Sequence, residues 1–599
     1  MQKLLLVSIG PVQDFIATAR RSRDLYFGSW MLSELSKSVA RRLADSFGME
    51  NLIFPAPSSL ADLDAESGFN VANRVLVAIK EDSPPVDLDK LISQALNERL
   101  KCIRQEAFGR IKGAFDRKVA NDQVDDLIEY YWVSVTFENT TAYHRQRRSL
   151  ESLMAARKNT RAFRQPSWGD AIPKSSLDGQ RESVLPETIF DDLSPVQLYQ
   201  QYHVRPGERL SGVGLLKRHG SRRKDIRFFS TSHVAALPYL AQLDASQKHA
   251  VDNYVQSLLK LGLDKEALGN VPGSPHPAFG RYDGHILYPG RLAEFFSGEV
   301  LGSAEAALET FFRTINDGRR PQSYYALLVG DGDHIGKMID AQQTTEDHRK
   351  FSLTLAGFAN EVKKVVENHQ GSLIYAGGDD VMAFLPVHTV LSCAAELSRT
   401  FVDIMKESGL KNKEGQVPTF SVGIAISHHL DPLADALTLA RKAEYDAKTL
   451  RPEKNALTIA VAKRSGATTT VIGPWGELDR RIALFTYLHQ KEAIPDKIGY
   501  ELRDMTRRIG VDKDDPAYPA LSDVIILEAV RLLGRKRSER GQSPIDKTLQ
   551  KCLTTLFKTS TAGVAGIADE LIVARLFAEV ADLAGQQPDD AVMEVCKHE

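Results

Sequence analysis

The chain has 599 residues, of which 43% are hydrophobic and 26% are charged, and its formal net charge at pH 7 is −2. Because most domains hold roughly 100 to 150 residues, this length predicts about three to five domains. The composition excludes a largely disordered chain. The balanced charge excludes a uniformly basic nucleic-acid-binding protein, so any contact with nucleic acid must come from local patches.

The N-terminus, MQKLLLVSIGPVQ, contains a short apolar run that stops at Gly10 and Pro11. No small-residue cleavage pattern follows, so we interpret the run as a strand and not as a signal peptide. No stretch approaches the roughly 18 apolar residues of a membrane span. The four cysteines form no CxxC pair, so neither a disulfide framework nor a zinc site is expected. We predict a cytoplasmic protein without membrane contact.

Residues 1–145 are predicted to form a first domain. After the N-terminal strand comes a helix, SWMLSELSKSVARRLAD, and then two further strand-like segments, NLIFPAP and NRVLVAI. Residues 146–320 are more heterogeneous and contain two basic clusters, HRQRRSLESLMAARKNTRAFR and KRHGSRRKDIR. Such clusters are solvated faces by default, and contact with RNA or phosphate is the open alternative.

Residues 321–470 have the clearest pattern. Strand-like runs over 324–330, 372–376, 381–385 and 418–427 alternate with helical segments over 351–368 and 390–405. A further helix over 431–448 and a last strand over 455–461 complete the unit. This β-α-β-β-α-β order predicts an α+β fold of the ferredoxin-like type.

The N-terminal region repeats this pattern in weaker form. When LLLVSIGPVQDFI is laid on YYALLVGDGDHIG, Gly10 falls opposite Gly330 and Pro11 opposite Asp331. The two regions therefore look like diverged copies of one fold, of which the first has lost its acidic positions. Residues 471–599 are helical in pattern, with amphipathic stretches such as ELIVARLFAEVADLAG that need a partner surface.

Three aspartates in the second copy are the strongest candidates for chemistry. Asp331 ends the first strand of that copy, and Asp379 and Asp380 lie in the turn of the hairpin LIYAGGDDVMAFL. Adjacent carboxylates repel each other, so a cation is expected between them. Oxygen ligands of this kind suit Mg²⁺ or Mn²⁺, and two such ions can support nucleotidyl transfer. We predict that these three residues are the metal ligands and the catalytic centre.

Nearby residues are expected to bind the nucleotide. Because Gly377 and Gly378 have no side chains, a nucleotide can approach the backbone of the turn closely. Gly332, which follows Asp331, is also expected to contact the nucleotide. Lys448, at the end of ARKAEYDAK, is expected to contact phosphate.

Each of these assignments has a structural alternative. A lone GGDD is a common solvated turn. A lysine such as Lys448 near the C-terminus of a helix is also favoured by the helix dipole, without any role in phosphate binding. Asp333 is interpreted as a cap or turn residue, and His428 and His429 are interpreted as turn residues and not as metal ligands.

Several motifs together resemble a known family. DGDHIGKM, AGGDDVMAF and ARKAEYDAKTLRPEKNAL resemble the GGDEF and polymerase-palm superfamily. More closely, GPVQDFIATARRSRDLYFGSWMLSELS, GERLSGVGLLKR, FGRYDGHILYPGRL and FSVGIAISHHLDPL resemble the large palm-domain subunit of type III-B, or Cmr-type, CRISPR effector complexes. The implied architecture is two ferredoxin-like palm domains, similar to GGDEF nucleotidyl cyclases, with an inserted small domain and a C-terminal helical domain.

The resemblance implies an enzyme that converts ATP into cyclic oligoadenylate messengers when a guide RNA captures a target RNA. Partners would be the other subunits of the complex, guide RNA, target RNA and ATP. Only the second palm would carry the metals. The first palm would hold the acceptor ATP, and the positions that correspond to this role are Gly10, Gln13, Ser29 and Ser33.

Two departures from the family pattern affect these expectations. The chain starts at the first palm and contains no His-Asp dipeptide, so no HD nuclease activity is expected. Relatives often carry a zinc site near segments that read PKSSLDGQ and GERLSGVG here, where Ser175, Ser176 and Ser211 stand in place of cysteines. Hydrogen bonds and packing are expected to replace that metal.

Other functions stay open on the sequence alone. The same site could join AMP to another molecule, such as S-adenosylmethionine. A non-catalytic RNA-binding scaffold subunit and, less favoured, a diguanylate cyclase are further alternatives. Ser352 is a candidate for lining a base or ribose pocket, although serines on helix surfaces are common.

Overall fold

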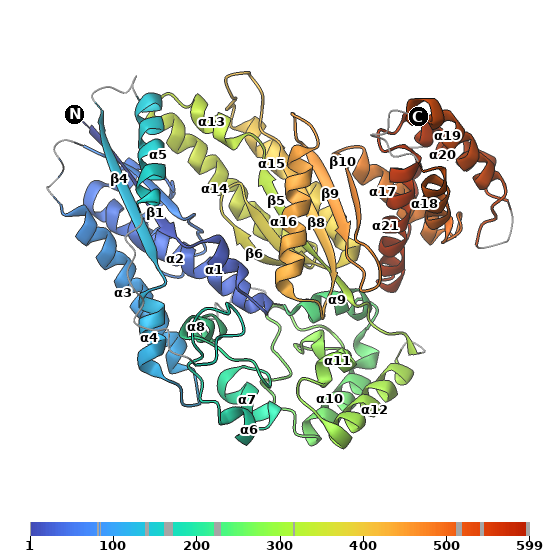
Figure 1. The fold of residues 1–599 in the computed structure, drawn as a ribbon, viewed down its shortest axis with the longest axis horizontal. Coiled ribbons are helices and arrows are strands. Elements are labelled where there is room, and N and C mark those ends of the chain that lie inside the picture. Colours follow the sequence, from blue (N-terminus) through green and yellow to red (C-terminus); the bar gives the residue numbers. More distant parts are fainter. Residues whose placement is uncertain are drawn as a thin grey trace.

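The fold was analysed in a computed structural model of the chain. The structure describes residues 2–80, 83, 86–137, 143–160, 172–220, 229–315, 318–510, 518–539 and 544–594. The first sheet lies towards one end of the molecule, the second sheet near its middle, and the C-terminal helices at the opposite end (Figure 1). Within the described residues, no helix combines the length and the apolarity that crossing a membrane requires.

The first sheet consists of β1 (Gln2–Gly10), β2 (Leu52–Phe54), β3 (Arg74–Ile79) and β4 (Glu129–Phe137), in the order β2-β3-β1-β4. Side chains alternate between the two faces of β1. Leu5 and Val7 therefore pack under α2 (Ser22–Phe47) and α3 (Leu88–Gly109), whereas Leu4 and Leu6 pack under α5 (Tyr143–Asn159). Because α5 covers the first sheet, the predicted domain boundary at residue 145 falls inside a helix of this unit.

The second sheet has the strand order β10-β9-β8-β5-β7-β6. Its strands are β5 (Tyr324–Gly332), β6 (Ser372–Ala376), β7 (Val381–Leu385), β8 (Phe420–His428), β9 (Ala456–Val461) and β10 (Thr469–Pro474). The order β8-β5-β7-β6 repeats the order of the first sheet, as expected for two copies of a ferredoxin-like fold. The sequence did not predict β10, and the expected boundary at residue 470 lies within it.

Helices cover both faces of the second sheet. α14 (Thr345–Asn368) and α15 (Val387–Glu407) share a core with Ala326 and Leu328, and α16 (Leu433–Thr449) packs on the opposite face with Tyr325 and Leu327. Gly423 lets α16 lie directly on β8, because a Cβ atom at this residue would be 2.1 Å from the backbone nitrogen of Glu444. This close packing fixes the position of α16 relative to the end of β5.

The two palm-like units contact each other in a reciprocal way. The long helix α2 of the first unit touches β6 of the second, and α14 of the second touches β2 of the first. Arg349 on α14 donates to the carbonyl oxygen of Leu52 at 3.0 Å, and a buried 2.6 Å hydrogen bond joins Tyr143 to His348. Both bonds link the units through buried or half-buried groups.

The region between the units does not form one core of its own. Residues of α7 (Pro195–Tyr202) and α8 (Gly212–His219) join the core of the first sheet. Those of α9 (Thr231–Leu240), α10 (Lys248–Lys260) and α12 (Gly298–Thr314) join the core beneath α16. The shorter helices are α1 (Gln13–Ala17), α4 (Arg117–Asp125), α6 (Ile189–Asp192), α11 (Pro289–Leu292) and α13 (Ile335–Ala341).

The C-terminal helices are α17 (Leu478–Gln490), α18 (Ile498–Ile509), α19 (Tyr518–Gly534), α20 (Lys547–Thr559) and α21 (Gly563–Leu583). The amphipathic stretch predicted to need a partner surface is α21, which adds Val573 and Phe577 to the core of the second sheet. A buried ion pair between Arg481 and Glu570, 2.8 Å apart, joins α17 to α21. Cys552 on α20 is disulfide-bonded, which the cysteine pattern did not lead us to expect.

Candidate functional site

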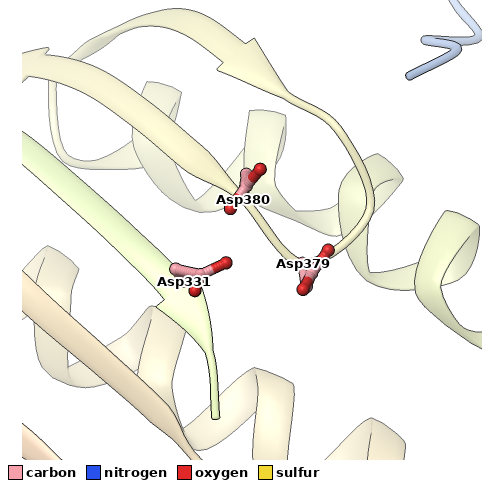
Figure 2. Close-up of side chains that lie close together, drawn as sticks. All are labelled: Asp331, Asp379 and Asp380. Carbon is pink, nitrogen blue, oxygen red and sulfur yellow. The ribbon is translucent and has the colours of Figure 1, made fainter. Parts of the chain in front are cut away.

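The three predicted aspartates meet at one edge of the second sheet. β5 pairs with β7 so that Gly330 lies opposite Val381, which places Asp331 next to Asp380. The backbone N–H of Gly332 also donates to the carbonyl oxygen of Asp379 at 3.2 Å. One carboxylate oxygen from each aspartate lies within 4.8 Å of the others. Figure 2 shows Asp331 at the end of its strand and Asp379 and Asp380 on the facing turn.

The two glycines before the aspartates are required by the turn. Gly378 has a φ of 100°, a backbone conformation that residues other than glycine rarely adopt. At Gly377 a Cβ atom would lie 1.6 Å from the hydroxyl oxygen of Tyr375. The backbone N–H of Gly377 donates to the carbonyl oxygen of Asp380 at 3.0 Å and closes the turn. The carboxylates are thus held by the conformation of the hairpin itself.

The acid pair carries negative charge that the local packing disfavours. Burial, reinforced by the neighbouring Asp380, raises the pKa of Asp379 to about 7. Solvent reaches Asp380 from one side, yet the atoms packed around its carboxyl group raise its pKa to about 6. A divalent cation would relieve both effects, and three carboxylates are hard ligands of the kind that Mg²⁺ and Mn²⁺ prefer. The residues present therefore fit such an ion.

These shifts predict a pH-dependent stability with a definite sign. A carboxyl group whose pKa is raised on folding stabilises the fold below its unfolded pKa of about 4, and that contribution is lost as the pH rises through the folded value. Without divalent ions, we expect the midpoint temperature of thermal unfolding to decrease as the pH rises from about 5 to about 8. Asp380→Asn should raise the midpoint at the higher pH, because it removes a charge that repels Asp379.

Thermal unfolding in EDTA and in Mg²⁺ at both pH values measures this effect. The unmodified chain should gain stability from Mg²⁺ at the higher pH, and Asp380→Asn should gain little. Asp446→Asn, on the solvent side of α16, is the matched control and should behave like the unmodified chain. A lower midpoint for Asp380→Asn than for the unmodified chain in EDTA would contradict the interpretation.

Lys448 lies beside the triad. Side chains alternate along β5, so Asp331 shares the face of Tyr325 and Leu327 on which α16 lies. There the ammonium group of Lys448 forms an ion pair with Asp331. Burial and the neighbouring Lys454 lower the pKa of Lys448 to about 8. The cation predicted for phosphate binding is therefore next to the predicted metal ligands.

Asp333 lies in a different environment from Asp331, the other aspartate of the DGD segment. It is fully buried, and its Oδ2 atom accepts hydrogen bonds from the Thr419 hydroxyl at 2.8 Å, from the Ser421 hydroxyl at 2.9 Å and from the backbone N–H of Asn455 at 3.0 Å. These bonds tie the end of β5 to β8 and β9. The geometry agrees with the interpretation of Asp333 as a turn residue.

A pocket between the two palm-like units opens beside the glycines. Its walls come from both units and mix apolar and polar side chains. The lining residues are Phe54, Pro55, Ala56, Gly68, Phe69, Asn70 and Ala72 from the first unit, and Ser352, Leu355, Ala356, Ala359, Asn360, Lys363, Leu373, Gly377 and Gly378 from the second. Ser352, the candidate for a base or ribose pocket, is among them.

The residues predicted for the acceptor nucleotide lie elsewhere in the first unit. Gly10 ends β1, and Gln13 is an exposed residue at the start of α1. Ser29 and Ser33 are buried on α2, where the hydroxyl oxygen of Ser33 accepts a 2.8 Å bond from the backbone N–H of Val71. None of the four is among the lining residues of the pocket, and their nucleotide role stays a prediction.

The second basic cluster is not a solvated face where it is described. Lys217 and Arg218 are buried at 1% and 0% exposure, and His219 is buried beside them. Lys217 donates to the carbonyl oxygen of Thr18 at 2.7 Å, beyond the end of α1. The default interpretation is wrong here, because charged side chains that meet carbonyl or carboxylate partners can be buried. Residues 221–227 of this cluster lie outside the described residues.

Residues of the first basic cluster, and His429, connect different secondary-structure elements. Arg147 and Arg148 both form ion pairs with Asp340 on α13. The part of this cluster over 161–164 lies outside the described residues. The ring of His429 is buried and hydrogen-bonds to the hydroxyl of Ser232 at 2.9 Å, which supports a structural role for that histidine.

The serines at the family's zinc positions make hydrogen bonds. Ser176 accepts from the backbone N–H of Arg209 at 3.0 Å, and Ser211 caps α8 by accepting from the N–H of Gly214. The hydroxyl of Ser175 accepts from the N–H of Leu177. The bond from Arg209 to Ser176 connects the two segments, whereas the bonds of Ser175 and Ser211 each lie within one segment.

Glu444 lies in the motif ARKAEYDAK but was not among the residues predicted for the site. Its Oε1 atom lies 3.4 Å from the ammonium nitrogen of Lys448. Burial, together with Asp380 and Asp333, raises the pKa of Glu444 to about 7. The i, i+4 spacing from Lys448 was the signal that could have shown it.

Comparisons with known proteins agree with this architecture. Residues 324–458 match a family model described as the second palm domain of Cas10/Cmr2, and residues 4–105 match one described as the N-terminal part of the CRISPR-associated protein Cmr2. The CRISPR system Cmr subunit Cmr2 of Pyrococcus furiosus is 25% identical over 560 residues. That match covers 79% of this chain and 63% of the relative's length.

Solved structures show the same fold at lower identity. A chain of type III-B Cmr-beta in the apo state, determined by cryo-EM, has a TM-score of 0.64 at 14% identity and covers 96% of this chain and 81% of that one. Type III-B Cmr-beta bound to cognate target RNA gives a TM-score of 0.59 at 14% identity, with 96% and 83% covered. Together, these findings confirm the resemblance and the palm-domain architecture.

Proposed function

We propose that this Cas10/Cmr2-type chain is the large palm-domain subunit of an RNA-guided type III-B CRISPR complex and that it converts ATP into cyclic oligoadenylates when target RNA binds. The observation that carries the proposal is the position of the aspartate triad, which lies beside a pocket lined by both palm-like units. An acid site that adjoins such a pocket suits a reaction on a nucleoside triphosphate.

The residues divide the work of nucleotidyl transfer among them. Asp331, Asp379 and Asp380 would hold divalent ions, which neutralise the developing charge on the phosphates. The apolar part of the pocket, including Phe69 and Leu355, suits the flat faces of a purine base. Gly377 and Gly378 leave the turn open to the phosphates, and Lys448 supplies a cation near them.

The bonds exchanged in this reaction balance without another reactant. A ribose hydroxyl oxygen of the acceptor forms a bond to the α-phosphorus of the donor ATP, while the bond from that phosphorus to pyrophosphate breaks. The hydroxyl proton passes to solvent or to a basic side chain. Closing the last linkage within one oligonucleotide yields a cyclic product by the same step.

The first palm unit is proposed to hold the acceptor. Asp14, next to Gln13, is close enough to Arg441 on α16 to counteract part of the effect of burial, which lowers the pKa of Arg441. The start of α1 is therefore close enough to α16 for charges on the two helices to interact. Gly10, Gln13, Ser29 and Ser33 remain the proposed acceptor-side positions.

The assay for this function is incubation of the assembled complex with ATP, Mg²⁺ or Mn²⁺ and cognate target RNA. We expect 3′–5′ linked cyclic adenylates, which mass spectrometry identifies, and far less product when GTP replaces ATP. Adding S-adenosylmethionine tests the alternative acceptor, because an AMP conjugate would appear only in its presence. A complex that binds target RNA but turns over no nucleotide would favour the scaffold.

A pocket variant links the assay to this site. Ala356→Phe should fill the pocket and lower ATP binding by roughly 100-fold, because a ring of this size displaces the base. Leu353→Phe, on the exposed side of the same helix, is the matched control and should bind ATP normally. Normal ATP binding by Ala356→Phe, measured by calorimetry, would place the nucleotide elsewhere.

A further inference from the structure

Glu444 and Lys448 lie one helical turn apart on α16, on the side that faces the aspartate triad. The helix is fixed there by the direct contact between its backbone and Gly423 of β8. In turn, β8 pairs with β5 so that Ser421 lies opposite Asp331. A side chain at position 444 is therefore held at a set distance from the metal ligands.

Lys448 has two carboxylate partners in this arrangement. One is Asp331 and the other is Glu444, at 3.4 Å. The side chains of Lys448 and Glu444 are only 18% and 19% exposed, so the pair is more shielded from solvent than an ordinary surface ion pair. Asp380, Asp333 and Lys454 are the other charged groups that act on Glu444.

A second ion pair on the same helix shows what an ordinary one looks like. Lys442 and Asp446 have the same i, i+4 spacing and a separation of 3.0 Å, but Lys442 is 69% and Asp446 28% exposed. Pairs of this kind on a helix surface contribute only a few tenths of a kcal/mol. The Glu444 pair differs because it lies against the site and shares its lysine with a metal ligand.

We propose that Glu444 is a positioning residue that keeps the Lys448 ammonium group at the edge of the triad, ready to contact the triphosphate. The inference rests on the proposed function. A carboxylate that binds a divalent ion is a weak partner for an ammonium group, because the two cations repel each other. Once Asp331 holds a cation, Glu444 is the partner that prevents Lys448 from swinging into solvent.

The inference predicts a direction that simple charge repulsion would reverse. Glu444 has the same sign of charge as a triphosphate, so its removal would tighten nucleotide binding if repulsion were its main effect. If positioning of Lys448 dominates, removal weakens binding, and only while Lys448 is present. The two effects are therefore separated by the sign of the change and by its dependence on Lys448.

A double-mutant cycle tests the inference in the full chain. The variants are Glu444→Gln, Lys448→Ala and the two combined, and the measurement is the affinity for a non-hydrolysable ATP analogue with Mg²⁺ by calorimetry. We expect Glu444→Gln to weaken binding roughly tenfold, the size of one charge-assisted hydrogen bond. In the Lys448→Ala background, the same change should have less than about a twofold effect. Glu444→Asp, which keeps the charge, should restore most of the affinity.

Controls separate this role from a general effect on the fold. Asp446→Asn removes the carboxylate of the exposed pair on the same helix and should leave binding unchanged. Thermal unfolding of each variant shows whether α16 is intact. Three outcomes would overturn this inference while leaving the proposed function intact, provided that the unmodified chain binds the analogue normally. Glu444→Gln could weaken binding equally with and without Lys448, it could tighten binding, or it could leave binding unchanged. If the unmodified chain bound no nucleotide, the proposed function would fall and this inference with it.

Discussion

Replacing Asp379 and Asp380 together by alanine is expected to abolish nucleotide turnover. The two carboxylates come from one turn, and with Asp331 they place three ligand oxygens within 4.8 Å of one another. Removing two of the three leaves too few ligands to hold a divalent ion, which keeps its remaining positions for water and phosphate. Divalent ions stabilise the charge of the transition state by several kcal/mol, so the loss should be roughly 1,000-fold or more.

The measurement is product formed from labelled ATP by the assembled complex with target RNA, over a range of Mg²⁺ and Mn²⁺ concentrations. Asp379→Asn with Asp380→Asn should give the same loss without a change in side-chain size. Because both substitutions remove destabilising charge, we expect these variants to remain folded. Asp446→Asn serves again as the control, on a half-buried carboxylate of α16 that is not part of the triad.

Persistent product in the double alanine variant would remove the triad from the mechanism. Loss of target RNA binding in the same variant would instead point to a structural defect. A complex that retains RNA binding and loses all product is the outcome that the proposed mechanism requires.

Replacing Asp24 by alanine is expected to have the largest effect on stability. Asp24 on α2 forms an ion pair with Arg218 on α8 at 2.9 Å, and Glu208 binds the same guanidinium at 2.8 Å. The three side chains are at most 4% exposed. Truncating one member of a buried, hydrogen-bonded ion network typically costs about 3–5 kcal/mol, because a charge is left without compensation.

Hydrogen exchange and thermal unfolding of the full chain measure this loss. Exchange should increase in α2 and α8, which the network joins, more than in the second palm unit. Arg42→Ala is the control, because its ion pair with Glu98 is exposed (46% and 64%) and should contribute no more than about 1 kcal/mol. Equal effects of Asp24→Ala and Arg42→Ala would contradict the assignment of a buried network.

This network joins residues from two of the motifs that resemble the family. The segment RSRD contributes Asp24, and GERLSGVGLLKR contributes Glu208, Lys217 and Arg218. In the structure these residues join α2 to the region that follows the first sheet. The basic character of Lys217 and Arg218 suggested a solvated face or a contact with RNA, but both side chains are buried and serve the packing of the first unit. Sequence alone does not distinguish these cases, because burial depends on what lies opposite each side chain.

The second unit was predicted more fully than the rest of the chain. Its helices and strands have strong periodicity, and the hairpin between β6 and β7 is marked by Gly377 and Gly378. Because strands that pair across a short turn must be neighbours, the approach of Asp380 to Asp331 could be inferred once the ferredoxin-like order was accepted. By contrast, β10 was missed, since TTVIGP is short and ends in proline.

What the sequence by itself determined is the repeated palm-like fold and the identity of the acidic turn. Both follow from local rules, because side-chain periodicity selects strands and helices, and glycine permits the turn. Only the tertiary structure decided that Lys448 meets Asp331, that Ser352 reaches a pocket shared by two units, and that Arg218 is buried. Those facts depend on which helix packs against which strand, and long-range packing of this kind leaves no periodic signal along the chain.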